Sequence, residues 1–136
     1  MRRFLLVVGL VALLAQLVAV YAPSAPNEHV IPDLDKVVHF SIFAAPTALF
    51  LLAGLRLALV VPLLAAHGPV SEWVQGEFLP HRDGSWQDAA ADLVGVAAGW
   101  AIVYAFGRRG RGESAPVVVS SGSVRHGADE GGGARR

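Results

Sequence analysis

Four long apolar stretches constrain this chain more than any other feature of its sequence. The first, Phe4 to Val20, carries no charge over about 17 positions, close to the minimum for a helix that crosses about 30 Å of hydrocarbon. The second is Val37 to Leu55, and the third starts at Leu57 after a single arginine. The fourth, Ala89 to Phe106, is rich in Ala and Gly, which let membrane helices approach closely. We predict an all-α, small polytopic membrane protein with four transmembrane helices.

The third stretch is the least regular of the four. It continues to about Val74 and contains Pro62, Gly68 and Pro69. Proline inside a helix removes one backbone hydrogen bond and clashes with the preceding turn. We therefore expect a kinked or interrupted helix here.

Composition separates the apolar part from the end of the chain. Hydrophobic residues make up 54% of the sequence and charged residues 16%, which is far from the balance of a soluble domain. After Phe106 the chain turns to arginine, glycine and serine, a composition that cannot bury enough apolar surface to become ordered. We expect one transmembrane domain over residues 1–106 and a disordered cytoplasmic tail over residues 107–136.

The charges predict how the chain lies in the plasma membrane. If all four stretches cross, most arginines near their ends fall on one side, which the positive-inside rule makes cytoplasmic. Both termini are then cytoplasmic. The acids of the two outer loops and the adjoining helix ends fall on the other face: Glu28, Asp33, Asp35, Glu72, Glu77, Asp83, Asp88 and Asp92.

A cleaved signal peptide is the alternative for residues 1–22. Arg2 and Arg3, the apolar stretch and the small residues from Ala22 to Ala25 match its outline. Pro23 and Pro26 are unfavourable just after a cleavage site, and this favours a retained span.

Several function classes are disfavoured by what the sequence lacks. The 11 basic and 11 acidic residues balance, so net charge gives no reason to expect a nucleic-acid partner. Cysteine is absent, which excludes disulfides and thiolate metal sites. There is no HExxH, no glycine-rich phosphate loop and no GxSxG motif, and we expect no organic cofactor.

Ionisable side chains cluster at the outer end of the second predicted helix. Asp35 and His39 are four residues apart and share a helix face, with Lys36 beside them. Asp35 could simply stabilise the helix N-terminus, and Lys36 could extend to the headgroups. His39 lies inside the apolar stretch, where an ionisable group is costly unless it faces partners or water.

The third helix carries a second polar pair at the same predicted end. Glu72 and Gln75 share a face, while Trp73 and Trp86 lie at the depth where indoles mark the membrane interface. His67, with Ser71, is deeper, and we interpret both as helix packing residues.

The start of the fourth helix carries two acids and a glycine on one stripe. Asp88, Asp92 and Gly95 stand at positions i, i+4 and i+7. Asp92 is a full turn deeper than Asp88 and needs a cation, a proton or hydrogen-bond donors. Arg82 is the expected counter-charge, although its guanidinium would equally suit a phosphate or carboxylate ligand.

The order and spacing of these residues resemble the VanZ-like family of small bacterial membrane proteins. The matching motifs are Asp35-Lys36-x-x-His39-Phe40, Glu72-x-x-Gln75, Arg82 and Asp88-x-x-x-Asp92-x-x-Gly95. The resemblance covers about Tyr21 to Trp100 and departs at Asp92, where the family frequently has Asn. It implies a shared site formed by Asp35, Lys36, His39, Glu72, Gln75, Asp88 and Asp92. The family is named for a member linked to teicoplanin resistance.

Two classes of function fit this set of residues. The first is an accessory or binding protein that engages an envelope component, such as a glycopeptide, a lipid-linked precursor or a cationic group, at the acidic outer face. The second is a membrane enzyme acting on a lipid-linked substrate, with His39 as acid or base, or with the carboxylates and His39 holding Mg, Mn or Zn. Transport is disfavoured, because polar groups at one end form no path across the bilayer.

Overall fold

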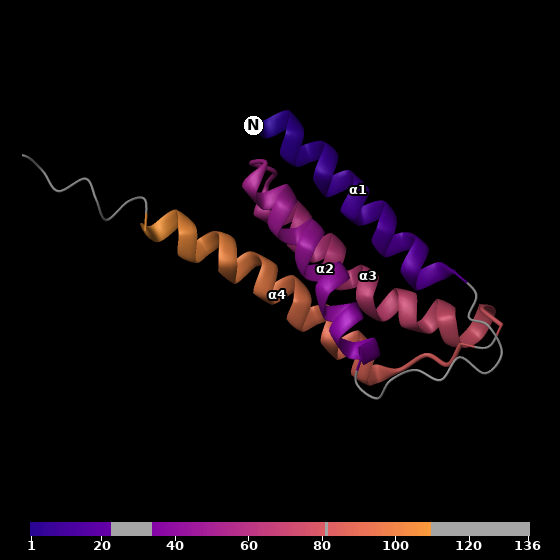
Figure 1. The fold of residues 1–136 in the computed structure, drawn as a ribbon. Helices are drawn as coiled ribbons and strands as arrows, with labels where there is room; N and C mark the ends of the chain where they lie inside the picture. The colour runs from indigo at the N-terminus through magenta and orange to yellow at the C-terminus, as the bar shows by residue number, and fades with distance from the viewer. Residues whose placement is uncertain (23–33, 81, 110–136) are drawn as a thin grey trace, which may run out of the picture.

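The described part of the chain is entirely helical. The computed structural model describes residues 1–22, 34–80 and 82–109, which form four α-helices (Figure 1). These are α1 (Arg2–Tyr21), α2 (Leu34–Leu52), α3 (Leu57–Phe78) and α4 (Trp86–Arg109). Each is long and apolar enough to cross a membrane, as the four stretches predicted. The fold class is confirmed at this level.

A tight turn joins α2 to α3. Gly54 has a φ of 82°, in the left-handed region that glycine adopts without steric cost. The Arg2 side chain donates from Nε to the carbonyl oxygen of Ala53 at 3.1 Å, which ties the beginning of α1 to this turn. The α2–α3 connection and the start of α1 therefore lie at the same end of the molecule.

Of the two outcomes expected for the third stretch, a kink or an interruption, the interruption is wrong. α3 runs as one helix through Pro62 and Pro69 and ends at Phe78, beyond the expected Val74. In a helix that packs against neighbouring helices, such contacts tolerate the hydrogen bond that each proline removes. Within the same part of α3, Ser71 Oγ donates to the Gly68 oxygen at 2.7 Å.

The fourth helix is also longer than its apolar stretch. It begins at Trp86, three residues before Ala89, and continues through Arg109. Residues 107–109 of the predicted tail are thus helical, and the remainder of that tail, 110–136, lies outside the described residues.

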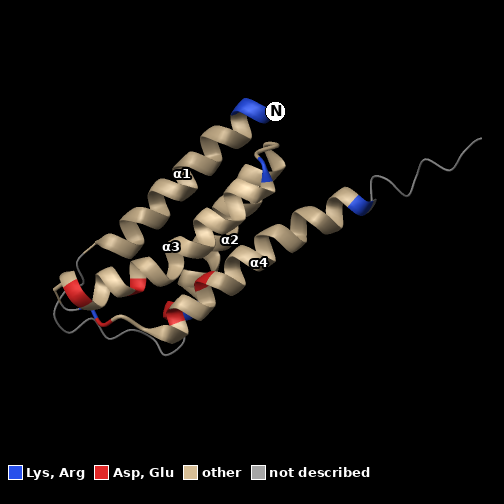
Figure 2. Cartoon of the chain, turned by 180° about the vertical axis from the view of Figure 1, so that it is seen from behind, with Lys and Arg blue, Asp and Glu red and all other residues tan. Residues whose placement is uncertain are grey.

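The helices alternate in direction, so that α2 and α4 run parallel to each other. The end of α1, the start of α2, the end of α3 and the start of α4 meet at one end of the molecule (Figure 1). The acidic residues of the described part of the chain gather toward this end, while basic residues lie at the start of α1, in the α2–α3 turn and at the end of α4, at the opposite end (Figure 2). We call the first the acidic end.

Two glycines determine how closely α4 approaches α2, its main packing partner. A Cβ atom at Gly95 would collide with the carbonyl oxygen of Phe40, and one at Gly99 would lie 2.6 Å from the carbonyl oxygen of Ala44. The two backbones are therefore in direct contact, as small residues permit between membrane helices. This contact fixes the axial register of α4 against α2.

The interior is more polar than the surface. Among the described residues, eight buried side chains are polar or charged and seven are hydrophobic. The buried polar set consists of Gln16, His39, Thr47, Ser71, Glu72, Gln75, Asp88 and Asp92. Large apolar side chains such as Val7, Leu14 and Leu63 face outward, with exposed fractions of 59%, 62% and 72%. Such a surface suits an apolar surrounding phase better than water.

Candidate functional site

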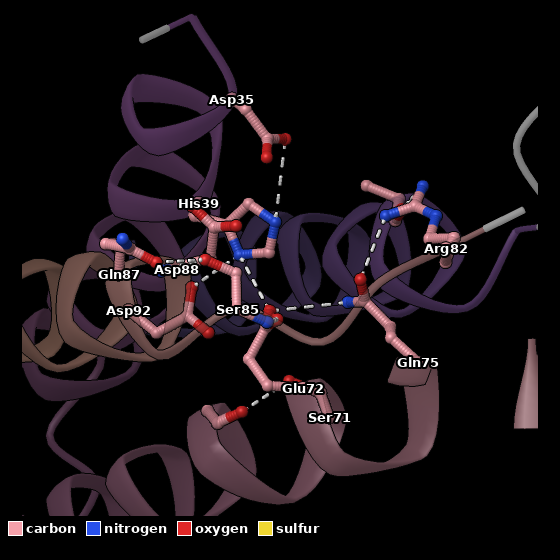
Figure 3. Close-up of polar contacts among 12 residues, drawn as sticks. Asp35, His39, Ser71, Glu72, Gln75, Arg82, Ser85, Gln87, Asp88 and Asp92 are labelled. Atoms are coloured by element: carbon pink, nitrogen blue, oxygen red, sulfur yellow. Dashed lines mark hydrogen bonds and ion pairs between the residues drawn. The ribbon is translucent and has the colours of Figure 1, made fainter. Parts of the chain in front are cut away.

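The acidic end is organised around the imidazole of His39. Its Nδ1 lies 2.9 Å from Asp92 Oδ1 and 3.5 Å from Glu72 Oε1, while its Nε2 lies 3.8 Å from Asp35 Oδ1 (Figure 3). The side chains of His39, Glu72 and Asp92 are at most 6% exposed, whereas that of Asp35 is 47% exposed. Three helices thus converge on one ring, with one of its nitrogens facing two buried carboxylates.

Helix register explains why these groups meet. Asp35 and His39 are one turn apart on α2, as are Asp88 and Asp92 on α4. Because the Gly95 backbone contacts the carbonyl of Phe40, the residue about one turn before Gly95 is brought near the residue just before Phe40. Those two residues are Asp92 and His39. The close approach of the backbones therefore positions the shortest contact of the cluster.

The loop between α3 and α4 contacts both the side chain and the main chain of Glu72. The backbone N–H of Ser85 donates to Glu72 Oε2 at 2.9 Å, and Gln75 Nε2 lies 3.5 Å from Glu72 Oε1. A Cβ atom at Gly84 would collide with the main-chain carbonyl of Glu72, so the loop lies directly on α3. One carboxylate oxygen is held by the loop, and the other faces His39.

Ser85 was not singled out by the sequence analysis. Its hydroxyl oxygen lies 3.4 Å from the backbone nitrogen of Asp88, the geometry of an N-cap, and it also donates to Gln87 Oε1 at 2.9 Å. The sequence signal was present, since a serine followed three residues later by an acid marks a helix start.

Two carboxylate oxygens of the cluster have no hydrogen-bond partner. They are Oδ2 of Asp92, a residue with no exposed surface, and Oδ1 of Asp88, a residue that is 7% exposed. Gly68 leaves room for Asp92, because a Cβ atom there would lie 2.9 Å from Asp92 Cβ. One imidazole can supply one positive charge to Glu72, Asp88 and Asp92, and buried acids in such excess attract a further cation.

Arg82 is not the counter-charge of Asp92 that the sequence suggested. Its guanidinium donates to Gln75 Oε1 at 3.3 Å and to the carbonyl oxygen of Ala19 at 2.9 Å. Ala19 is in the last turn of α1, where carbonyls lack helical partners and carry partial negative charge. Arg82 therefore links the end of α1 to α3, and His39 takes the place beside Asp92.

The remaining predicted residues occupy different surroundings. Gln75 is buried beside Glu72, whereas Lys36 is exposed on α2. Asp88 belongs with Asp35 and His39 to a second group whose ligand atoms all lie within 4.8 Å of one another. The group of His39, Glu72 and Asp92 meets the same limit and is entirely buried.

Gln16, Tyr21 and His67 form a second polar cluster, which the sequence did not predict. Gln16 Nε2 and the Tyr21 hydroxyl each lie 3.1 Å from a different ring nitrogen of His67, and Phe43 stacks on that ring. His67 is indeed a packing residue, as expected. Its partner Gln16 was the only amide in an apolar stretch, a signal that pointed to a buried polar contact.

A cleft opens beside the cluster between α3 and the start of α4. It has a volume of about 550 Å³, and the residues that line it include the acids Glu72, Glu77 and Asp83 together with Trp73 and Trp86. Among the described residues no lysine or arginine lines it. We call this feature the acidic cleft, and Glu72 connects it to the buried cluster.

These residues give the acidic end two chemical capacities. The buried cluster offers one imidazole and several carboxylates to a cation or a proton, and the acidic cleft offers carboxylates and aromatic faces to a larger positive group. Comparison of the chain with protein-family models, with curated proteins and with solved structures gave no match.

Proposed function

We propose that this chain is a VanZ-like accessory membrane protein of the bacterial cell envelope that binds a cationic group of an envelope ligand in the acidic cleft. The observation that carries the proposal is the lining of that cleft, with three acidic residues, two tryptophans and, among the described residues, no lysine or arginine. Carboxylates attract an ammonium group through charge, and indole faces attract it through the ring quadrupole. The family resemblance points to an envelope ligand such as a glycopeptide, for example teicoplanin, or a lipid-linked precursor.

The surface of the molecule supports its placement in the plasma membrane as a multi-pass protein. Many of its outward side chains along the helices are large and apolar, while four ionisable side chains, those of His39, Glu72, Asp88 and Asp92, are buried among the helices, an arrangement suited to the lipid bilayer as surrounding phase. α1 supports a retained span, because Val20 and Gln16 are fully buried and the Ala19 carbonyl accepts a hydrogen bond from Arg82. The arginine-rich end is then cytoplasmic and the acidic end external.

This topology predicts opposite labelling of the two ends in intact cells. A single cysteine at Asp83, an exposed residue of the α3–α4 loop, should react with a membrane-impermeant maleimide without lysis. A single cysteine at Arg56, which is exposed in the α2–α3 turn, should react only after lysis. The chain contains no cysteine of its own, so each signal has one source. The reverse pattern would contradict the orientation.

Ligand binding is tested with dansylcadaverine, a fluorescent primary amine, and its N-acetylated neutral form. Fluorescence anisotropy of the protein in nanodiscs should show saturable binding of the amine alone, with empty nanodiscs as baseline. The Glu77→Gln/Asp83→Asn double variant should bind it at least about tenfold more weakly, a loss of about 1.4 kcal/mol, because two charges leave the cleft. Trp86→Ala should also weaken binding, whereas Trp100→Ala, which changes an indole outside the cleft, should not. Equal binding of the two probes would contradict the proposal.

A membrane enzyme acting on a lipid-linked envelope substrate is the second candidate. The contact of His39 Nδ1 with Asp92 Oδ1 at 2.9 Å favours it, because an acid that orients an imidazole is a recurring general-base arrangement. A turnover assay of the His39→Gln variant separates the candidates, because amine binding in the acidic cleft does not require His39. In an enzyme this change abolishes turnover of the lipid-linked substrate, whereas in an accessory protein it leaves function intact.

A further inference from the structure

We propose that His39, Glu72 and Asp92 bind a divalent transition-metal ion, with zinc as the probe of choice. This inference goes beyond the proposed ligand function, since the metal would occupy the buried cluster and the amine the acidic cleft. It starts from the three donor atoms, His39 Nδ1, Glu72 Oε1 and Asp92 Oδ1, which come from α2, α3 and α4 (Figure 3). One ligand atom from each of the three residues lies within 4.8 Å of the other two.

The spacing of the donors matches the edges of a coordination shell. Metal–ligand distances of about 2.1 Å place adjacent donors about 3.0 Å apart in octahedral geometry and about 3.4 Å apart in tetrahedral geometry. His39 Nδ1 lies 2.9 Å from the Asp92 oxygen and 3.5 Å from the Glu72 oxygen. One ring N–H can point at only one of these oxygens, whereas an ion between the three atoms would contact them all.

Asp92 gives independent support. It has no exposed surface, points into the cluster from α4, and leaves Oδ2 without a hydrogen-bond partner (Figure 3). A buried carboxylate oxygen without a partner is costly, and coordination of the same carboxylate to a cation offsets that cost.

The groups behind the donors have the arrangement of an outer coordination shell. Glu72 Oε2 accepts a hydrogen bond from the Ser85 N–H, so that Oε1 is turned toward His39. Asp35 Oδ1 faces His39 Nε2 at 3.8 Å, on the side where metal-bound histidines commonly donate to a carboxylate. Asp35 is thus a positioning residue, which favours the ring tautomer that leaves Nδ1 free for the metal.

The donor set selects the class of ion. One imidazole with two carboxylates suits Zn²⁺ or Mn²⁺, because Mg²⁺ and Ca²⁺ prefer shells made of oxygen alone. Three protein ligands leave at least one position for water or a ligand atom, as in metal sites that bind substrates. Glu72, one of the three ligands, also lines the acidic cleft.

The test measures how much zinc the full chain retains. The protein is purified in detergent, stripped of metal with a chelator, loaded with zinc and dialysed. Its metal content is then determined by mass spectrometry. The wild type should retain about one zinc per chain, and His39→Gln and Asp92→Asn should retain less than about a tenth of that. His67→Gln is the matched control, because its ring contacts Gln16 and Tyr21 and lies outside the donor set. Zinc retention by the wild type no greater than that of His39→Gln would overturn the proposal.

A second measurement does not depend on the folding of any variant. X-ray absorption of the zinc-loaded wild type should show one imidazole and otherwise oxygen ligands, and a shell without imidazole would overturn the proposal. Asp35→Asn should weaken zinc binding by about tenfold and leave the same shell, because it acts through the ring and not on the ion. Failure here is distinct from failure of the cleft, because amine binding is measured without added metal and requires neither His39 nor Asp92.

Discussion

Alanine at Gly95 is expected to destabilise the protein by about 3 kcal/mol, the upper range for overpacking a closely packed interface. Its new methyl group would collide with the carbonyl oxygen of Phe40, and this atom belongs to the α2 backbone and cannot rotate away. α2 and α4 must then move apart, which also separates His39 from Asp92. Reversible unfolding in mixed detergent micelles, followed by circular dichroism, measures the change in free energy.

Gly107→Ala is the matched control for this effect. Gly107 lies on the same helix, and a Cβ atom there would meet nothing within 4 Å. Alanine favours a helix over glycine by up to about 1 kcal/mol, so this variant should be unchanged or slightly more stable. Equal losses at Gly95 and Gly107 would show that the close approach of α2 and α4 contributes nothing to stability.

Leucine at His39 is expected to cost about 3–5 kcal/mol in metal-free protein, the range found when one partner of a buried ion pair is removed. When protonated, the imidazole is the positive partner of Glu72 and Asp92, whose side chains are 6% and 0% exposed. Its loss leaves their charges and that of Asp88 close together with less compensation. The same unfolding assay, run with a chelator present, gives the free energy.

A double-mutant cycle separates this electrostatic effect from a simple loss of packing. Asp92→Leu removes one of the stranded acids, so the His39→Leu/Asp92→Leu double variant should be more stable than the sum of the single losses predicts. A coupling of about 1–3 kcal/mol is expected for groups that share a hydrogen bond. Additive losses would mean that His39 stabilises the fold only as a packed ring.

Both predictions depend on how α4 packs against α2. The contact at Gly95 sets the register of α4, and that register places Asp92 beside His39. Substitutions at Gly95 should therefore also weaken zinc retention, although Gly95 carries no ligand atom. Stability and metal binding are linked through the interface between α2 and α4.

Part of this organisation follows from the sequence alone. Apolar length fixes four potential spans, because only a helix satisfies its own backbone within about 20 apolar residues. Spacings of four residues place Asp35 with His39, and Asp88 with Asp92, on common helix faces. Short connections reverse the chain direction, which brings all these groups to one end.

The pairing of these groups was decided only by tertiary structure. Arg82 was expected beside Asp92 but donates to the end of α1, while His67 finds its partner Gln16 51 residues away. α3 continues through both of its prolines although their local effect favours a break. Periodicity within a helix specifies the face and depth of a side chain. Rotation and register between helices depend on backbone contacts such as those of Gly95 and Gly99, which join residues far apart in sequence.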